Sequence, residues 1–461
     1  MSMVRRYLDK KIFVLYFMQF ILCFICFSFR NIRIDTILAS IQIVMTFIIV
    51  NIVCGELFNY GTLFIVLTYV FHMGNLAVTQ LFGYENNYLY SLSKDVICTS
   101  IAFYMLCHLA VLIGMCSSVS KEYINRSKDK FIINRNGLLL TGMVCAILGA
   151  FPKLYVDYQR ILAQQSTDYS TSVTISGQYG WMSIVAQFFY VGVLILIFLS
   201  KEHKIRARII LVLASICEVV SMMSGGRLNQ VSFLLIMVCV YVMRVERPKM
   251  SQVIVLFILA YFLCVLLNTI ADLREIGTIG LEDFRNAIVN SLDVKNHIFD
   301  LLSEAGGTFM SLGLAKENFP LYHGFVFGRS YIDSILSVIP AYERNIADIN
   351  SLIFIYSFPT NNWLGGSWLG EVYFNFSWTG CIFCYFIGRM LGKVENIFAN
   401  DDKKNNFIGS LSVLAFMYPG IVWIRDYFYK FTTYIQVCAV VLVIAYILSR
   451  ISTNKCYKFI N

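Results

Sequence analysis

Long apolar runs recur along almost the whole chain, and they constrain its fold more than any other feature. A helix that crosses a membrane needs about 20 mostly apolar residues. Twelve segments meet this requirement, and they lie at 12–29, 35–54, 61–82, 96–118, 137–154, 179–199, 207–224, 228–243, 250–270, 365–388, 407–424 and 431–449. Only 14% of the residues are charged, whereas a soluble domain carries about 25%. The sequence therefore predicts an all-α, polytopic integral membrane protein with about 12 transmembrane helices.

The distribution of Lys and Arg predicts how these helices are oriented. Cytoplasmic loops of membrane proteins collect basic residues. If the N-terminus is cytoplasmic, the cytoplasmic segments carry 23 of the 37 Lys and Arg residues. We therefore expect both termini in the cytoplasm. The net charge of +9 is then mostly a signal of topology, and it gives no reason to expect a nucleic-acid partner.

One connection is much longer than the others. Residues 271–363 hold 11 acidic and 6 basic residues and no cysteine, and a loop of this length is usually functional. Apolar residues in 281–302 recur at helical spacing, so we expect a small helical cap on the outer membrane face. The chain is thus expected to have three parts: helices 1–9 in 1–270, the large extracytoplasmic loop in 271–363, and helices 10–12 with a cytoplasmic tail in 364–461.

The sequence contains no nucleotide-binding signature of the Walker or Rossmann type. The 14 cysteines lie almost entirely in apolar runs, where a cysteine behaves as a small hydrophobic residue. The five histidines form no cluster with metal-ligand spacing. We therefore expect neither a cofactor nor a metal.

Several cations lie at the outer ends of the predicted helices, on the side where basic residues are usually scarce. Ser224-Gly225-Gly226-Arg227 combines flexible glycines, a helix start and a guanidinium group, which together suit a phosphate. The other outer cations are Arg274, Arg329, Arg425, Lys153 and Arg160. These residues favour an anionic ligand, although contact with lipid headgroups would explain each one taken alone.

Two carboxylates are candidates for chemistry. Glu371 is predicted about two turns into the span 365–388, where an ionisable group is costly and therefore a functional candidate. The alternative for Glu371 is a structural ion pair with an arginine such as Arg425. Glu304, in the long loop, is the second candidate. Glu218 lies deeper in the span 207–224, and we expect it to form a structural pair.

The run Gly365-Gly366-Ser-Trp-Leu-Gly370-Glu371-Val-Tyr-Phe-Asn375-Phe-Ser-Trp-Thr-Gly380 resembles the G-x-S-x-x-G-E-x-Y-x-N-F-G-x-x-G segment of Wzy-type oligosaccharide repeat-unit polymerases. Four further stretches fit in order, namely 224–227, 303–309, 328–331 leading to Pro340, and Arg425-Asp426. The resemblance covers most of the chain. Ser377 stands where the family usually has Gly, and we expect this departure to affect helix packing more than chemistry.

The resemblance implies a C-type membrane glycosyltransferase in the bacterial cytoplasmic (inner) membrane. Such enzymes join undecaprenyl-pyrophosphate-linked oligosaccharide units into O-antigen or capsular polysaccharide on the outer face of that membrane. A flippase delivers the units, and a chain-length regulator is an expected partner. No nucleotide sugar is used, in agreement with the missing nucleotide motifs.

This activity assigns roles to the candidate residues. Arg227 and Arg425, helped by Arg274 or Arg329, would stabilise the charge that develops on the pyrophosphate. Glu371, or as second choice Glu304, would take the proton of the acceptor hydroxyl. Two alternatives differ in function: a lipid-linked oligosaccharide flippase or other transporter, which would have short outer loops and internal symmetry, and an O-antigen ligase with a different acceptor.

Overall fold

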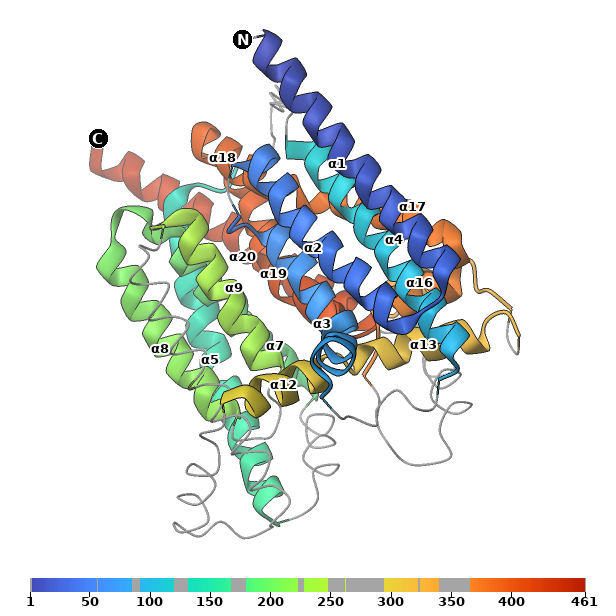
Figure 1. Ribbon diagram of the computed structural model, residues 1–461. Coiled ribbons are helices and arrows are strands. Elements are labelled where there is room, and N and C mark those ends of the chain that lie inside the picture. Colours follow the sequence, from blue (N-terminus) through green and yellow to red (C-terminus); the bar gives the residue numbers. More distant parts are fainter. Residues whose placement is uncertain are drawn as a thin grey trace. The chain divides into compact units, whose positions relative to one another are not determined.

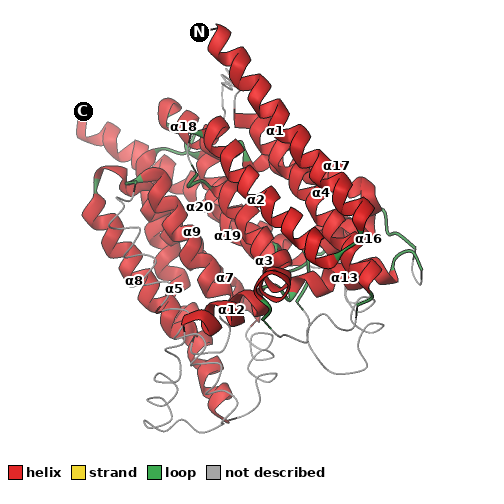
Figure 2. Cartoon of the chain, in the orientation of Figure 1, coloured by secondary structure: helices red, strands yellow, loops and turns green. Residues whose placement is uncertain are grey.

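The computed structural model describes residues 2–55, 57–84, 92–119, 132–166, 180–222, 228–247, 262, 294–321, 324–339 and 365–460. Helices and short 3-10 turns are the only regular secondary structure in these ranges (Figure 2). The predicted all-α class is therefore confirmed.

Seven of the described helices are long and apolar enough to cross a membrane, and each matches a predicted span. These stretches are Lys11–Phe29, Ile32–Cys54, Tyr60–Phe82, Lys94–Ser118, Arg135–Leu162, Gly180–Glu202 and Phe428–Ser452. Two shorter apolar helices, Asn229–Arg244 and Ile408–Trp423, match two further predictions. The described part of the predicted span 207–224 is helical, but this helix is not among those long and apolar enough to cross a membrane. The predicted span 250–270 lies almost wholly outside the described residues.

The chain divides into two compact units. Unit 1 comprises residues 1–125, 302–397 and 420–432, and unit 2 comprises 126–301, 398–419 and 433–461. The helices that lie wholly in unit 1 are α1 (Ser2–Phe29), α2 (Ile32–Cys54), α3 (Tyr60–Phe82), α4 (Lys94–Val119), α13 (Thr308–Asn318), α14 (Arg329–Leu336), α16 (Trp368–Phe376), the 3-10 turn η3 (Ser377–Thr379) and α17 (Gly380–Leu391). Figure 1 shows α1 to α4 as a set of adjacent long helices.

Unit 2 has its own set of helices. Those wholly inside it are α5 (Arg135–Ser166), α7 (Gly180–Leu199), η2 (Ser200–Glu202), α8 (Lys204–Met222) and α9 (Leu228–Arg244). Four helices include residues of both units: α12 (Val294–Ala305), α18 (Val394–Lys404), α19 (Ile408–Trp423) and α20 (Phe428–Ile460).

Glycines allow the closest helix contacts in each unit. In unit 1, a Cβ atom built on Gly114 of α4 would collide with the backbone of Tyr385 in α17, and one on Gly388 of α17 would collide with the backbone of Val111 in α4. In unit 2, Gly149 of α5 and Gly192 of α7 approach the backbone of the opposite helix in the same way. Small residues at such contacts let helix backbones approach closely inside a membrane.

The predicted span 365–388 is wrong as a continuous helix. The segment forms α16, then the 3-10 turn η3, then α17. The break occurs at Ser377, whose backbone has φ 54° and ψ −143°. This region of backbone space is occupied almost only by glycine, which explains a glycine preference at this position. The departure at Ser377 therefore acts on the backbone of the break, and not mainly on helix packing as expected.

The described parts of the long loop, 294–321 and 324–339, contain α12, α13 and α14, but α13 is not a cap on a surface. Nearly all of α13 is buried, and it packs against α3, α4 and α16 within unit 1. The end of α12, just before α13, reaches α3 at Gly74, where a Cβ atom would collide with the carbonyl oxygen of Leu302. Gly74 lies eight residues before the end of α3, or about 12 Å along the helix. The loop therefore inserts among the helices of unit 1.

Candidate functional site

Glu371 lies in the first turn of α16, and the local sequence explains why the helix begins there. Ser367 has an extended backbone and caps the helix, because its Oγ accepts a hydrogen bond from the Gly370 N–H (3.0 Å). A carboxylate in the first turn also interacts favourably with the positive end of the helix dipole. The Glu371 side chain is directed into unit 1, and the residue is only 1% exposed.

Both carboxylate oxygens of Glu371 accept hydrogen bonds from other segments. The Ser330 hydroxyl of α14 donates to Oε1 (2.8 Å), and the Phe428 N–H at the start of α20 donates to Oε2 (2.6 Å). No ion pair joins Glu371 to Arg425, so the structural alternative considered for Glu371 is not the arrangement found between these two described residues. Glu371 instead connects α14, α16 and α20.

Asn375, one turn after Glu371, completes this network. Its Nδ2 donates to Ser330 Oγ (2.7 Å) and to the Glu371 main-chain carbonyl (2.8 Å), and its Oδ1 accepts from the Gly328 N–H (2.9 Å). The N–H groups of Val326 and Phe327 donate to the carbonyls that end α16. The sequence stretches 328–331 and 365–375, which were recognised separately, therefore form one hydrogen-bonded site.

Arg425 belongs to the turn between α19 and α20, and this turn contacts the beginning of the 365–380 motif. A Cβ atom on Gly366 would collide with the backbone of Asp426, and one on Gly365 would lie 3.5 Å from Arg425 Nε. Arg425 is half-buried, and among the residues that the structure describes it has no carboxylate within ion-pair distance.

The electrostatics of this turn are set by burial and by neighbouring cations. Burial raises the pKa of Asp426, whereas the Lys430 ammonium, the Tyr427 N–H and the Arg425 guanidinium oppose that rise in pKa. The Tyr427 N–H donates to Asp426 Oδ1 (2.8 Å). Asp426 thus fixes the turn that presents Arg425.

Arg329 directly precedes Ser330 at the start of α14. Its side chain is 65% exposed and forms an ion pair with the buried Asp333 (3.3 Å). The hydrogen bonds of Ser330 to Glu371 and from Asn375 fix the helix that carries Arg329. The structure thus brings Glu371, Arg329 and Arg425 onto three segments joined by the Glu371 network.

The remaining candidates from the sequence are not part of this network. Glu304 lies near the end of α12, where it is exposed, and the hydrogen bonds of Glu371 do not involve it. Arg227 and Arg274 lie outside the described residues.

Lys153, in unit 2, is unavailable to an anionic ligand. Its ammonium group is 3% exposed and contacts Asp157 (2.8 Å), Glu218 (3.3 Å) and Ser221 (2.6 Å). Arg160 lies 3.7 Å from Asp157. Two cations thus face two carboxylates, and buried charges in a membrane protein normally pair in this way. The structural pairing expected for Glu218 is confirmed, and Lys153 is satisfied within the protein.

A second lysine, Lys316 of α13, is half-buried in unit 1, and no ion pair joins it to a carboxylate among the described residues. Its ammonium group lies 4.0 Å from the ring centre of Trp378 and 4.9 Å from that of Tyr373, and it donates to the Thr99 carbonyl (3.2 Å). Burial lowers the pKa of Lys316 to about 7, and the Asp95 carboxylate opposes this. The rings also favour the charged form. Lys316 therefore holds α13 against α4 and the break after α16.

The motif residue Ser367 has a second role. The Nδ1 atom of His72 faces the Thr68 carbonyl (2.9 Å) and must carry the proton there, so Nε2 accepts the hydrogen bond from the Ser367 hydroxyl (2.9 Å). His72 is thus a hydrogen-bonding residue of unit 1, which connects α3 to the start of α16.

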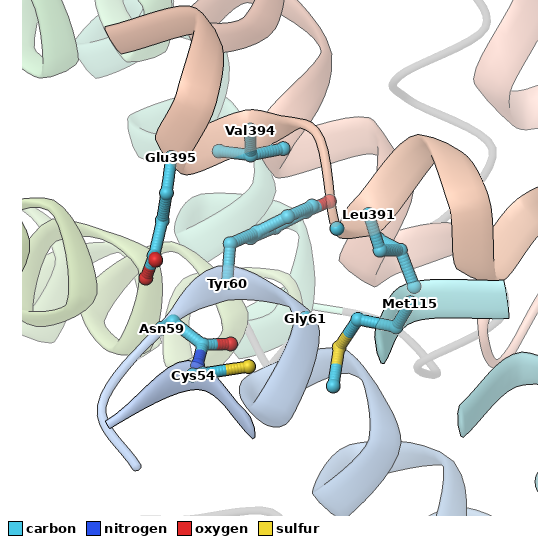
Figure 3. Close-up of a pocket in the computed structure, with 9 residues that line it drawn as sticks. Cys54, Asn59, Tyr60, Gly61, Met115, Leu391, Val394 and Glu395 are labelled. Carbon is cyan, nitrogen blue, oxygen red and sulfur yellow. The ribbon is translucent and has the colours of Figure 1, made fainter. Parts of the chain in front are cut away.

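Unit 1 also contains a pocket (Figure 3). It is lined by Cys54, Asn59, Tyr60, Met115 and Glu395, among others. Tyr60 begins α3, and His72, which contacts the candidate site, follows 12 residues later, or about 18 Å along the helix. The pocket is therefore not part of the Glu371 network.

Sequence reasoning missed three donors of the site. Ser330 and Asn375 lie inside the recognised stretches, so the motif spacing contained a signal for them. The Phe428 N–H is a backbone group two residues after the stretch Arg425-Asp426, at the first residue of α20, and no residue type in the sequence identifies it.

The comparisons with known proteins agree with these observations. The family model described as O-antigen polysaccharide polymerase Wzy matches residues 11–455 of the 461-residue chain. No protein of curated function and no solved structure matches the chain significantly. The match covers nearly the whole chain and does not favour the transporter or ligase alternatives. The chain therefore belongs to the Wzy family of O-antigen polysaccharide polymerases, and it polymerises O-antigen repeat units.

Proposed function

We propose that the chain is a C-type membrane glycosyltransferase with about 12 transmembrane helices and both termini in the cytoplasm. It acts on undecaprenyl-pyrophosphate-linked oligosaccharides at the outer face of the bacterial inner membrane. The family match and the seven long apolar helices support this proposal. A flippase that supplies the units and a chain-length regulator are its proposed partners.

The reaction has a simple chemical outline. A hydroxyl group of the incoming unit attacks the anomeric carbon of the growing chain, and the bond from that carbon to the lipid pyrophosphate breaks. Negative charge develops on the leaving pyrophosphate, so fixed cations stabilise the transition state. The attacking hydroxyl also loses a proton, which a carboxylate takes.

We propose that Arg425 and Arg329, together with Arg227 and Arg274, bind the pyrophosphate group. The observation that carries this assignment is the Glu371 network, which links the segments of two guanidinium groups through Ser330 and the Phe428 N–H. Arg425 has no described ion-pair partner and Arg329 is largely exposed. A guanidinium group can bind phosphate oxygens through two parallel hydrogen bonds.

For the base we propose Glu371 first and Glu304 second. Burial disfavours the ionised form of Glu371, whereas its two hydrogen-bond donors favour this form, which is the form that accepts a proton. An acceptor hydroxyl must take the place of the Ser330 hydroxyl to reach Oε1, because Glu371 is buried. Glu304 is the second choice because it is exposed at the surface of the protein.

The test is complementation of a strain that lacks the gene, with surface polysaccharide separated on a gel. Loss of the polymerase leaves a single repeat unit. Arg425→Ala and Arg227→Ala should give the same pattern at native protein level, because the leaving group loses its cations. A full-length ladder from either variant contradicts the pyrophosphate assignment for that residue.

The base is tested by Glu371→Gln and Glu304→Gln in the same strain. Glutamine keeps the shape of the side chain and removes the charge that accepts the proton. We expect Glu371→Gln to abolish the ladder while the purified protein remains folded. A normal ladder from Glu371→Gln combined with none from Glu304→Gln would transfer the role to Glu304.

A further inference from the structure

Helix α14 buries three polar side chains and exposes two apolar ones. Its polar residues Ser330, Asp333 and Ser334 are buried, whereas Ile332 is 57% exposed and Ile335 is 52% exposed. A helix on the surface of a soluble protein presents its polar face to water. The exposed isoleucines of α14 therefore indicate contact with something apolar.

The contacts of the buried face prevent α14 from rotating to hide these isoleucines. Ser330 donates to Glu371 Oε1, and the ring of Tyr331 packs against Phe376 (6.0 Å between ring centres), Phe383 (5.0 Å) and Phe428 (5.2 Å). Turning the helix would break the Glu371 network. The outward direction of Ile332 and Ile335 is thus fixed by the candidate site itself.

Arg329, a cation, lies at the N-terminal end of the exposed face of α14. Arg329, Ile332 and Ile335 follow one another at intervals of three residues, which places them on one side of a helix, and all three are exposed. Ile339, just after the helix, is 54% exposed. We call Ile332, Ile335 and Ile339 the α14 stripe. From Arg329 to Ile335 the stripe extends about 9 Å along the helix.

We propose that the α14 stripe binds the apolar chain of a polyprenyl pyrophosphate lipid whose anionic head lies at Arg329. This inference rests on the proposed function, because it assigns the lipid tail of the same substrate. The order of charges and apolar groups on the stripe matches that of the lipid: a cation for the head, followed by isoleucines for the chain. Neither a free sugar nor a hydrophilic peptide would cover exposed isoleucines.

The substrate lipid fits the stripe better than bulk membrane lipid does. Arg329 is adjacent to Ser330, so a phosphate bound there is placed beside the Glu371 network. Head and tail then hold the lipid at the site where its sugar must react. Bulk lipid explains the apolar contact but not the connection between the stripe and Glu371.

The test measures the affinity of the purified full chain in detergent for undecaprenyl pyrophosphate, inorganic pyrophosphate and phosphatidylglycerol. The double variant Ile332→Ser/Ile335→Ser should weaken binding of undecaprenyl pyrophosphate about tenfold, since burial of apolar area drives tail binding. Its affinity for inorganic pyrophosphate should stay unchanged. Arg329→Gln should weaken binding of both pyrophosphate ligands. Ile382→Ser, at an exposed position of α17, serves as matched control and should change neither.

The outcomes separate this inference from the proposed function. If the wild-type chain prefers undecaprenyl pyrophosphate and the double variant keeps that preference, the stripe assignment is wrong and the proposed substrate stands. Equal weakening for phosphatidylglycerol would make the stripe a bilayer contact and also overturn the inference. A wild-type chain without preference for the pyrophosphate lipid would overturn both. Ile332→Ala/Ile335→Ala, with a smaller effect of about threefold, replaces the serine variant if that variant does not fold.

Discussion

At the scale of single residues, the network around Glu371 depends on one hydroxyl group. Ser330 Oγ donates to Glu371 Oε1 and accepts from Asn375 Nδ2, so its removal takes a donor from the buried carboxylate and one of two acceptors from the buried amide. The sequence identified Glu371 through the motif and through its predicted position in a span. It placed Ser330 inside the stretch 328–331 but did not assign it a role, because only the fold brings this stretch to α16.

We therefore expect Ser330→Ala to lower the free energy of unfolding by about 1–3 kcal/mol, the usual cost of unsatisfied buried groups. Ser330→Thr keeps the hydroxyl and should retain most of the stability. Thermal unfolding of the purified protein in detergent measures both. Ser28→Ala is the control, because Ser28 is exposed and bonds only to the Phe24 carbonyl of its own helix. An equal change in Ser28→Ala and Ser330→Ala would contradict the role of Ser330.

At Ser377, in contrast, we expect a substitution that increases stability. Its φ of 54° and ψ of −143° are strained for a residue with a Cβ atom, at a cost of about 1–3 kcal/mol. Ser377→Gly should stabilise the protein by about 1 kcal/mol, since part of the gain is offset by the greater freedom of glycine in the unfolded chain. The measurement is again the midpoint of thermal unfolding. Ser377→Ala keeps the Cβ atom and should bring no gain, and a gain equal to that of glycine would refute the strain argument.

Lys316 predicts a dependence of stability on pH. In the unfolded chain a lysine has a pKa near 10.4, whereas burial lowers the pKa of Lys316 to about 7 in the fold. Between these values the unfolded state binds a proton that the folded state does not, so this group adds stability as the pH rises from about 7 to about 10. Lys316→Met removes the effect. At or below pH 7, the free energy of unfolding of the variant should exceed that of the wild type by the largest amount, and this difference should shrink towards pH 10. Thermal unfolding at several pH values measures it. A difference that is constant across this range would contradict the shifted pKa.

At the scale of elements, the sequence predicted the long apolar helices correctly, but it did not predict that the segment 365–388 is interrupted. The spans up to 82, for example, appear as Lys11–Phe29, Ile32–Cys54 and Tyr60–Phe82, because apolar length alone specifies a transmembrane helix. The segment 365–388 has the same apolar length, yet it breaks at Ser377. Hydropathy cannot detect this break, because it depends on one backbone conformation and on the segment 326–328 that binds the end of α16.

The contact between α4 and α17 gives a prediction for a pair of elements. A Cβ atom on Gly388 would collide with the backbone of Val111, and backbone atoms cannot move aside as a flexible side chain can. Gly388→Ala should therefore lower the free energy of unfolding by about 1–3 kcal/mol or more, as overpacking does. Gly180→Ala is the matched control, because a Cβ atom there meets nothing within 4 Å. Equal stability of the two variants would show that the helices can separate without cost.

At the scale of the whole molecule, the charge distribution predicts a topology with both termini in the cytoplasm. A phosphatase reporter, which is active only outside the cytoplasm, should be active when it is fused after residue 300 in the long loop. The same reporter should be inactive after residue 246 or after residue 404, because the basic segments 244–249 and 389–404 are predicted to lie in the cytoplasm. Activity at residue 404 would reverse the predicted orientation of the last helices.

The sequence by itself determined that the chain is an all-helical membrane protein, that its family is Wzy, and that Glu371 lies in its most specific motif. These properties depend on apolar length, basic-residue bias and motif spacing, which are all local along the chain. Only the tertiary structure decided that α13 is buried within unit 1, and that Ser330, Asn375 and the Phe428 N–H meet at Glu371. It also decided that Lys153 is neutralised by Asp157 and Glu218. The physical reason is that a buried polar group needs a partner, and the partner comes from a segment far away in sequence that only folding brings within hydrogen-bond distance.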